Sequence, residues 1–231
     1  MKIALCQINP IVGDIAGNRD KILNIIKKIN AELYVFPELS ITGYCPMDLI
    51  LKKHFIEKNL NSLNIIKKET NKKIILGFID SVGNKIFNSA AYISGNDVKY
   101  VYHKKKLPNY SVFDEKRWFN SGEKKGLIKI NDKKVGLSIC EDVWSGEICK
   151  SQDADIYINI SASPYSNIKI KKIEKVLLQR YNENKKPIFY LNQVGAQDGL
   201  VYFGHSMFIN DNTIVKKAKD FEEDILLVDV K

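Results

Sequence analysis

Apolar and polar positions along the chain follow two periods, and the change from one to the other predicts the order of its elements. Within residues 18–30, isoleucines recur at the spacing of one helix face, at Ile22, Ile25, Ile26 and Ile29. Residues 55–68 and 170–181 repeat that helical pattern. Short apolar runs rich in β-branched residues predict strands around these helices. These runs are 3–8, 32–36, 73–80, 87–93, 98–103, 127–130, 135–139, 155–160, 188–191, 207–209 and 225–230.

Turn residues join two pairs of these strands into hairpins. Gly95-Asn96-Asp97 precedes the strand 98–103, and Asn131-Asp132 separates 127–130 from 135–139. Hairpins pair strands antiparallel, whereas intervening helices favour parallel pairs, so the pattern predicts an α/β (α+β) protein with mixed sheets. The 231 residues contain no linker, repeat or low-complexity tract, and we expect residues 1–231 to form a single domain.

Three predicted strands end at residues whose side chains can take part in catalysis. The run 135–139 leads directly into Cys140, the run 32–36 is stopped by Pro37 before Glu38, and a third strand ends in lysines 104–106. Strand ends at one edge of a sheet are where α/β folds expose reactive groups. Most free cysteines are small buried residues, and Cys140 alone is equally compatible with that role. A thiol, a carboxylate and a fixed cation together are the set that acyl transfer at an amide requires.

In this order, Glu38, Lys104 and Cys140 resemble the Glu-Lys-Cys triad of the nitrilase (carbon–nitrogen hydrolase) superfamily. Further stretches are similar to the glutaminase domain of glutamine-dependent NAD synthetases, and the resemblance extends over essentially the whole chain. These stretches are residues 37–44 (PELSITGY), 107–117 (LPNYSVFDEKR), 139–144 (ICEDVW), 159–164 (NISASP) and 192–198 (NQVGAQD).

The resemblance implies a four-layer α-β-β-α sandwich with two mixed sheets, and a role for each triad residue. Cys140 would attack the side-chain amide of L-glutamine, Glu38 would move the proton, and Lys104 would stabilise the oxyanion. A main-chain N–H following Cys140 could supply a second oxyanion donor. The family pattern Lys-x-x-Leu-Pro selects Lys104 from three adjacent lysines, although His103 stands where the family usually has arginine. Glu115 matches a second glutamate that orients the lysine, but its charged neighbours also fit an exposed surface residue.

The resemblance also implies a glutamine pocket. Tyr110, Phe113 and Glu141 match positions that line this pocket in NAD synthetases, although the two aromatic residues also fit an ordinary core. Ser163 and Lys169 match positions that engage the α-amino and α-carboxylate groups. Some relatives carry arginine where this chain has Lys169, so a two-pronged carboxylate contact becomes a single point charge.

NAD synthetases of this type carry a second domain that binds ATP and uses the ammonia. Its Ser-Gly-Gly-x-Asp-Ser loop does not occur in this sequence. We therefore expect a glutaminase domain or subunit without a cofactor of its own. Its partner would be an NAD synthetase ATP-binding domain, in the same or another chain, to which ATP and Mg would belong. The family also suggests a homo-oligomer.

Composition also bears on the partners, the cellular compartment, and the metal and membrane binding to expect. The formal charge of +9 comes from scattered lysines without an aromatic or Gly-rich nucleic-acid motif, so no nucleic-acid partner is expected. The four cysteines lack a paired spacing and the first residues read as a strand, not a signal peptide, which favours a cytoplasmic protein. The three histidines lack metal-ligand spacing, so no metal site is expected. No apolar run approaches the roughly 20 residues that span a bilayer, so no membrane association is expected.

Two other functions stay open from the sequence. The chain could be a free-standing nitrilase-type amidase acting on another small amide. It could also be a non-catalytic assembly domain, although the complete set of Glu38, Lys104 and Cys140 argues against a decayed site.

Overall fold

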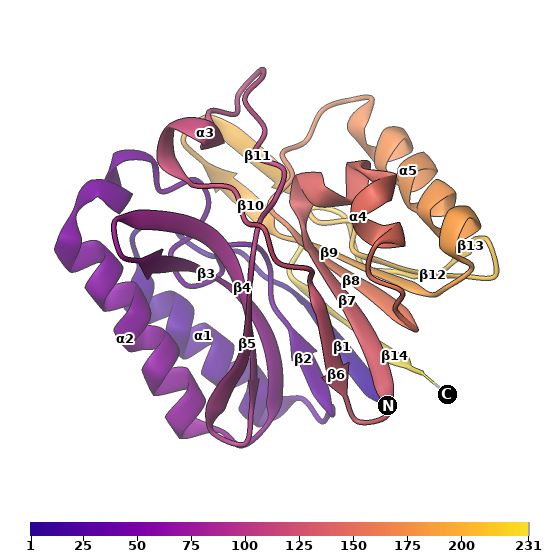
Figure 1. Cartoon of the computed structure of the whole chain (residues 1–231), viewed down its shortest axis with the longest axis horizontal. Coiled ribbons are helices and arrows are strands. Elements are labelled where there is room, and N and C mark those ends of the chain that lie inside the picture. Colours follow the sequence, from indigo (N-terminus) through magenta and orange to yellow (C-terminus); the bar gives the residue numbers. More distant parts are fainter. Residues whose placement is uncertain (231) are drawn as a thin grey trace.

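The computed structural model describes residues 1–230 and contains two six-stranded mixed sheets packed face to face (Figure 1). In the first sheet, β1–β2 and β2–β3 are parallel and the remaining pairs are antiparallel. Its strands, in spatial order, are β14 (Asp224–Asp229), β1 (Lys2–Gln7), β2 (Leu33–Val35), β3 (Lys73–Val82), β4 (Lys85–Ser94) and β5 (Asp97–His103).

The second sheet has a parallel centre, β7–β8–β9, and antiparallel edges. Its strands, in spatial order, are β13 (Thr213–Lys217), β12 (Met207–Asn210), β9 (Ile188–Asn192), β8 (Ile156–Ser161), β7 (Lys133–Ile139) and β6 (Leu127–Ile130). The predicted mixed sheets and four-layer sandwich are therefore confirmed.

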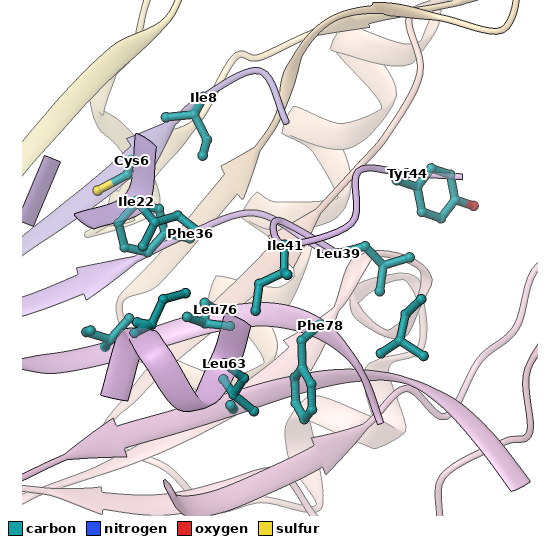
Figure 2. Packing of buried hydrophobic residues seen from close by; sticks show 14 of the residues in the cluster. Cys6, Ile8, Ile22, Phe36, Leu39, Ile41, Tyr44, Leu63, Leu76 and Phe78 are labelled. Carbon is teal, nitrogen blue, oxygen red and sulfur yellow. The ribbon is translucent and has the colours of Figure 1, made fainter. Parts of the chain in front are cut away.

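Alternating side chains divide the core into layers. In β1, Ile3 and Leu5 face the second sheet, while Ala4 and Cys6 face the helices α1 (Ile15–Lys28) and α2 (Lys53–Glu69). Figure 2 shows the helix-facing layer, where Cys6, Ile22, Phe36, Leu63, Leu76 and Phe78 pack together. Helices α5 (Lys169–Asn184) and α4 (Gly146–Lys150) contribute to a third cluster on the outer face of the second sheet. Because each sheet is covered on both faces, its central strands are buried on both faces, and the few polar residues within them, such as Asn88 and Asn159, are buried as well.

Several short elements were not expected from the sequence. They are η1 (Met47–Leu51), α3 (Glu115–Trp118), η2 (Cys140–Trp144), α4, the hairpin of β10 (Val194–Gln197) and β11 (Leu200–Phe203), and β13. In Figure 1, α3 and the hairpin lie at the top of the molecule, and the N-terminus and the end of β14 lie at the lower right. Within residues 1–230, no helix is long and apolar enough to cross a bilayer.

Candidate active site

Glu38 is positioned by a close approach between two neighbouring strands. Strand β2 ends at Val35, earlier than expected, and the chain then turns across β3, where Gly77 N–H donates to the Pro37 carbonyl at 3.1 Å. A Cβ on Gly77 would lie 2.2 Å from the main-chain nitrogen of Leu39 and 2.6 Å from the carbonyl carbon of Glu38. Glycine is therefore required at position 77 for this turn to hold Glu38 in place.

Lys104 joins two carboxylates in the protein interior. Its ammonium lies 2.7 Å from Oε1 of Glu38 and 2.7 Å from Oε1 of Glu115, and all three side chains are at most 1% exposed. The Tyr44 hydroxyl donates to the same Glu115 oxygen at 2.7 Å. Glu115 therefore belongs to this cluster and is not the exposed residue that its charged neighbours allowed.

Burial and neighbouring charges shift the pKa of Lys104 and of Glu115 in this cluster. Burial disfavours the charged lysine, but Glu115 and Glu38 outweigh it and hold the pKa of Lys104 well above its ordinary value. Burial raises the pKa of Glu115 to about 7; Lys104 opposes this rise and the charge of Glu38 adds to it. Lys104 therefore stays charged, and Glu115 binds its proton more tightly than an exposed carboxyl.

Glu38 has two further partners that the sequence analysis missed. Asn88 donates from its side chain to Oε1 at 2.7 Å, and its carbonyl accepts the main-chain N–H of Lys104 at 2.9 Å. The main-chain N–H of Ala162, beyond β8, donates to Oε2 at 2.7 Å. Asn88 is a polar residue in a strand that the sequence predicts to be buried, and a buried polar side chain usually has a hydrogen-bond partner. That was the available sequence signal.

Cys140 begins the turn η2 immediately after β7 and is 6% exposed. Its φ of 45° lies in the left-handed region, which costs free energy for a residue other than glycine and is typical of functional turns. Burial raises the pKa of the Cys140 thiol, the charge of Glu38 adds to the rise, and Lys104 and Lys169 oppose it. The thiol is therefore protonated near neutral pH, and it could act as a nucleophile only if a base removed its proton.

Four of the five residues expected to bind substrate are linked by contacts, with Phe113 between Tyr110 and Lys169. Tyr110 packs edge-on against Phe113 at 5.6 Å between ring centres, and its hydroxyl donates to Glu141 at 2.9 Å. The Lys169 ammonium lies 5.7 Å from the Phe113 ring centre and 5.4 Å from that of Trp144. These distances fit cation–π contacts, so Trp144 has a more specific contact than general packing.

Ser163 is held by Asn192, a residue that the sequence analysis did not select. Asn192 Oδ1 accepts the main-chain N–H of Ser163 at 2.7 Å, and its amide donates to the Ser163 carbonyl at 3.2 Å. Ser163 lies one residue beyond Ala162, whose N–H binds Glu38. The turn after β8 thus reaches both the buried cluster and the expected substrate groups.

A surface pocket of about 670 Å³ is lined in part by Tyr110 and Glu141. Lys105, Lys106 and Lys116 line it as well, so most of the charged side chains in its wall are basic. Among residues 1–230, no group of three or more histidine, cysteine or acidic side chains could hold a metal ion.

Comparison with known proteins identifies the family. Residues 2–231 match the family described as "Carbon-nitrogen hydrolase". The chain is 38% identical over 99% of its length to the glutamine-dependent NAD(+) synthetase of Aquifex aeolicus, and 36% identical over its full length to that of Thermotoga maritima. It spans only 42% of each of these relatives.

Two solved structures share the fold. The glutamine-dependent NAD+ synthetase of Acinetobacter baumannii, in complex with ADP, superposes with a TM-score of 0.93 at 33% identity, over 98% of this chain and 44% of that one. An amidase of the nitrilase superfamily from Nesterenkonia AN1 superposes with a TM-score of 0.88 at 22% identity, over 100% of this chain and 90% of that one. Together with the family match, these findings establish that the chain belongs to the carbon–nitrogen hydrolase family.

Proposed function

We propose that residues 1–231 form a glutaminase domain that hydrolyses L-glutamine to glutamate and ammonia through a thioester on Cys140. The observation that carries this proposal is the buried Glu38–Lys104–Glu115 cluster, whose charges act on the Cys140 thiol. A protonated thiol, a neighbouring carboxylate and a fixed cation supply the nucleophile, the base and the electrostatic stabilisation that amide hydrolysis requires.

In the first half-reaction, the Cys140 sulfur attacks the side-chain carbonyl carbon while Glu38 accepts the thiol proton. Lys104 has three N–H donors and gives two of them to carboxylates, so the third is available to the oxyanion. A main-chain N–H following Cys140 is the second donor. The carbon–nitrogen bond then breaks, Glu38 returns the proton to the leaving nitrogen, and ammonia departs.

In the second half-reaction, water attacks the thioester and Glu38 accepts a proton from it. The carbon–sulfur bond breaks, glutamate leaves, and the thiol regains its proton. Glu115 contacts only Lys104 and Tyr44 in this cluster, which supports a positioning role for it. No cofactor enters either step.

Recognition of the amino-acid end of glutamine is assigned to Lys169 and Ser163. Lys169 carries a charge close enough to affect Cys140 and contacts two aromatic rings, which suits it to a substrate carboxylate. Ser163 would receive the α-amino group, and Tyr110, Phe113 and Glu141 would line the pocket. A simple amide lacking the carboxylate would not use Lys169.

The released ammonia would serve an NAD synthetase ATP-binding domain, to which ATP and Mg would belong. The relatives support this, because they are named glutamine-dependent NAD(+) synthetases and this chain spans less than half of their length. We further propose a homo-oligomer located in the cytoplasm. The four free cysteines fit that reducing compartment.

The test is release of glutamate and ammonia from L-glutamine by the purified chain, beside Cys140→Ala and Cys149→Ala variants. Cys149 is the matched control because it is a buried free cysteine in α4. We expect Cys140→Ala to abolish release and Cys149→Ala to retain it. Undiminished release by folded Cys140→Ala would overturn the proposal, as would no release by the wild type even with an added synthetase domain.

A further inference from the structure

Asp142 is fully buried and binds the end of strand β5 on both sides of Lys104. Its Oδ1 accepts the main-chain N–H groups of Lys105 and Lys106 at 3.1 and 2.8 Å. Its Oδ2 accepts the Tyr102 hydroxyl at 2.8 Å. These donors lie within two residues of Lys104 along the chain, so the carboxylate holds the backbone from which Lys104 extends.

The same carboxylate also holds the backbone at Cys140. Asp142 Oδ2 accepts the main-chain N–H of Ile139, the last residue of β7, at 3.0 Å. This bond closes the turn in which Cys140 adopts its left-handed φ of 45°. A residue in that conformation persists only where surrounding contacts impose it.

Asp142 thereby connects the two sheets of the sandwich at the site. Lys104 follows β5, the edge strand of the first sheet, whereas Cys140 follows β7 of the second. Four donors satisfy the Asp142 carboxylate, although no lysine or arginine forms an ion pair with it among the described residues. Burying a carboxylate is costly, and other polar groups could close a single turn. What requires explanation is that all four donors belong to residues within two positions of Lys104 or Cys140 along the chain.

We propose that Asp142 is a positioning residue that sets the distance between the Lys104 ammonium and the Cys140 thiol. The proposal rests on the roles assigned to Lys104 and Cys140, but not on which amide is hydrolysed. Without the four hydrogen bonds of Asp142, Lys104 and Cys140 would both still be present, but the distance between the ammonium and the thiol would no longer be fixed. A displacement of about 1 Å between reacting groups can cost a rate factor of about 100.

The experiment compares Asp142→Asn with Asp155→Asn. In Asp142→Asn, the side-chain amide would have one acceptor oxygen in place of two, so at least one strand end would lose its acceptor. Asp155 is the matched control because its Oδ2 accepts the main-chain N–H of Lys134 at 2.8 Å, at the opposite end of β7. For Asp142→Asn we expect kcat for glutamine to fall about 10- to 100-fold with KM within about twofold, and Asp155→Asn to be unchanged.

A second readout does not depend on glutamine: the rate of alkylation of Cys140 by iodoacetamide between pH 6 and 9. Asp142→Asn should alter this rate and its pH profile, because the thiol would sit at a different distance from the Lys104 charge. A merely structural role would lower the melting temperature and leave kcat and the pH profile of the folded fraction unchanged. If the wild type failed to hydrolyse glutamine, this alkylation profile would still test the positioning role of Asp142.

Tyr102→Phe covers the case in which Asp142→Asn does not fold, because it removes one of four donors and keeps the buried ring. We expect a loss in kcat of about threefold at unchanged KM, with a matching change in Cys140 alkylation. The proposal is overturned if the folded variant, or Tyr102→Phe in its place, keeps the wild-type kcat and alkylation profile.

Discussion

The ammonium of Lys104 lies 2.7 Å from Oε1 of Glu38, and neither side chain is exposed to solvent. Glu115 shares the same ammonium at 2.7 Å, so one cation serves two buried carboxylates. The two carboxylates hold the pKa of Lys104 well above its ordinary value. The pKa of Glu115 is raised chiefly by its burial, and the charge of Glu38 adds to the rise.

Replacing Lys104 with methionine should destabilise the fold as well as abolish activity. The methionine would leave Glu38 and Glu115 buried without their cation, and breaking a buried pair in this way costs about 3–5 kcal/mol. Urea denaturation of Lys104→Met measures the free energy of unfolding directly. Lys106→Ala, which removes an exposed lysine two residues away, should change it by less than about 0.5 kcal/mol. Equal stabilities for the two variants would contradict the buried ion cluster.

The stability of the wild type should depend on pH through Glu115. Its pKa is raised to about 7 in the folded protein, so over the interval from its ordinary value of 4.5 to about 7 the folded state binds more protons than the unfolded one. The contribution of Glu115 is therefore fully present below pH 4.5 and is lost as pH rises through about 7. Glu115→Gln does not titrate and should lack this term.

The measurement is the unfolding free energy of wild type minus that of Glu115→Gln, followed from about pH 4.5 to 8. We expect this difference to fall as pH rises. Glu147→Gln, at an exposed position in α4, provides the control and should show no trend. A difference that increases with pH would mean that the Glu115 pKa is lowered on folding.

Cys140 should be alkylated slowly at neutral pH. Because burial raises the pKa of its thiol, the reactive thiolate should be scarce at pH 7 and should increase steadily up to pH 9. The rate is obtained from the mass of the peptide that carries Cys140 after timed exposure to iodoacetamide. A plateau reached below pH 7 would indicate a preformed thiolate and would remove the need for Glu38 as a base.

Lys169→Ala should weaken binding of glutamine without slowing the chemistry. Loss of a charged contact to the substrate carboxylate should raise KM about tenfold while kcat changes little. Trp144→Leu, which removes one of the two rings beside the ammonium, should raise KM about threefold. Lys171→Ala is the control at an exposed position two residues away. An unchanged KM for Lys169→Ala would favour the alternative of an amidase that does not read an α-carboxylate.

The sequence was sufficient for those site residues that end strands. Apolar runs preceding Glu38 and Cys140 located both residues, whereas Lys104 was distinguished from its neighbours only through the family pattern Lys-x-x-Leu-Pro. Contacts between residues that are far apart in the sequence could not be predicted in this way. Tyr44 meets Glu115 across 71 positions, and a pattern along one strand does not show which strands meet.

The structure also differs from the sequence-based prediction in the start of one helix and in one exposed strand. Helix α1 begins at Ile15 and not near residue 18, because Asp14 caps it by accepting the Gly17 N–H at 2.9 Å. Strand β13 was missed because none of its residues is buried, so it lacks the alternation of apolar and polar positions that marks a strand.

The most direct test of hydrolysis through Cys140 is the identification of the covalent intermediate. The wild type and Cys140→Ala would be mixed with L-glutamine, quenched in acid within the first turnovers, and digested for mass spectrometry. We predict a γ-glutamyl group on the peptide containing Cys140, absent from the Cys140→Ala variant. Glutamine turnover with the acyl group on another residue, or turnover retained by Cys140→Ala, would contradict this prediction.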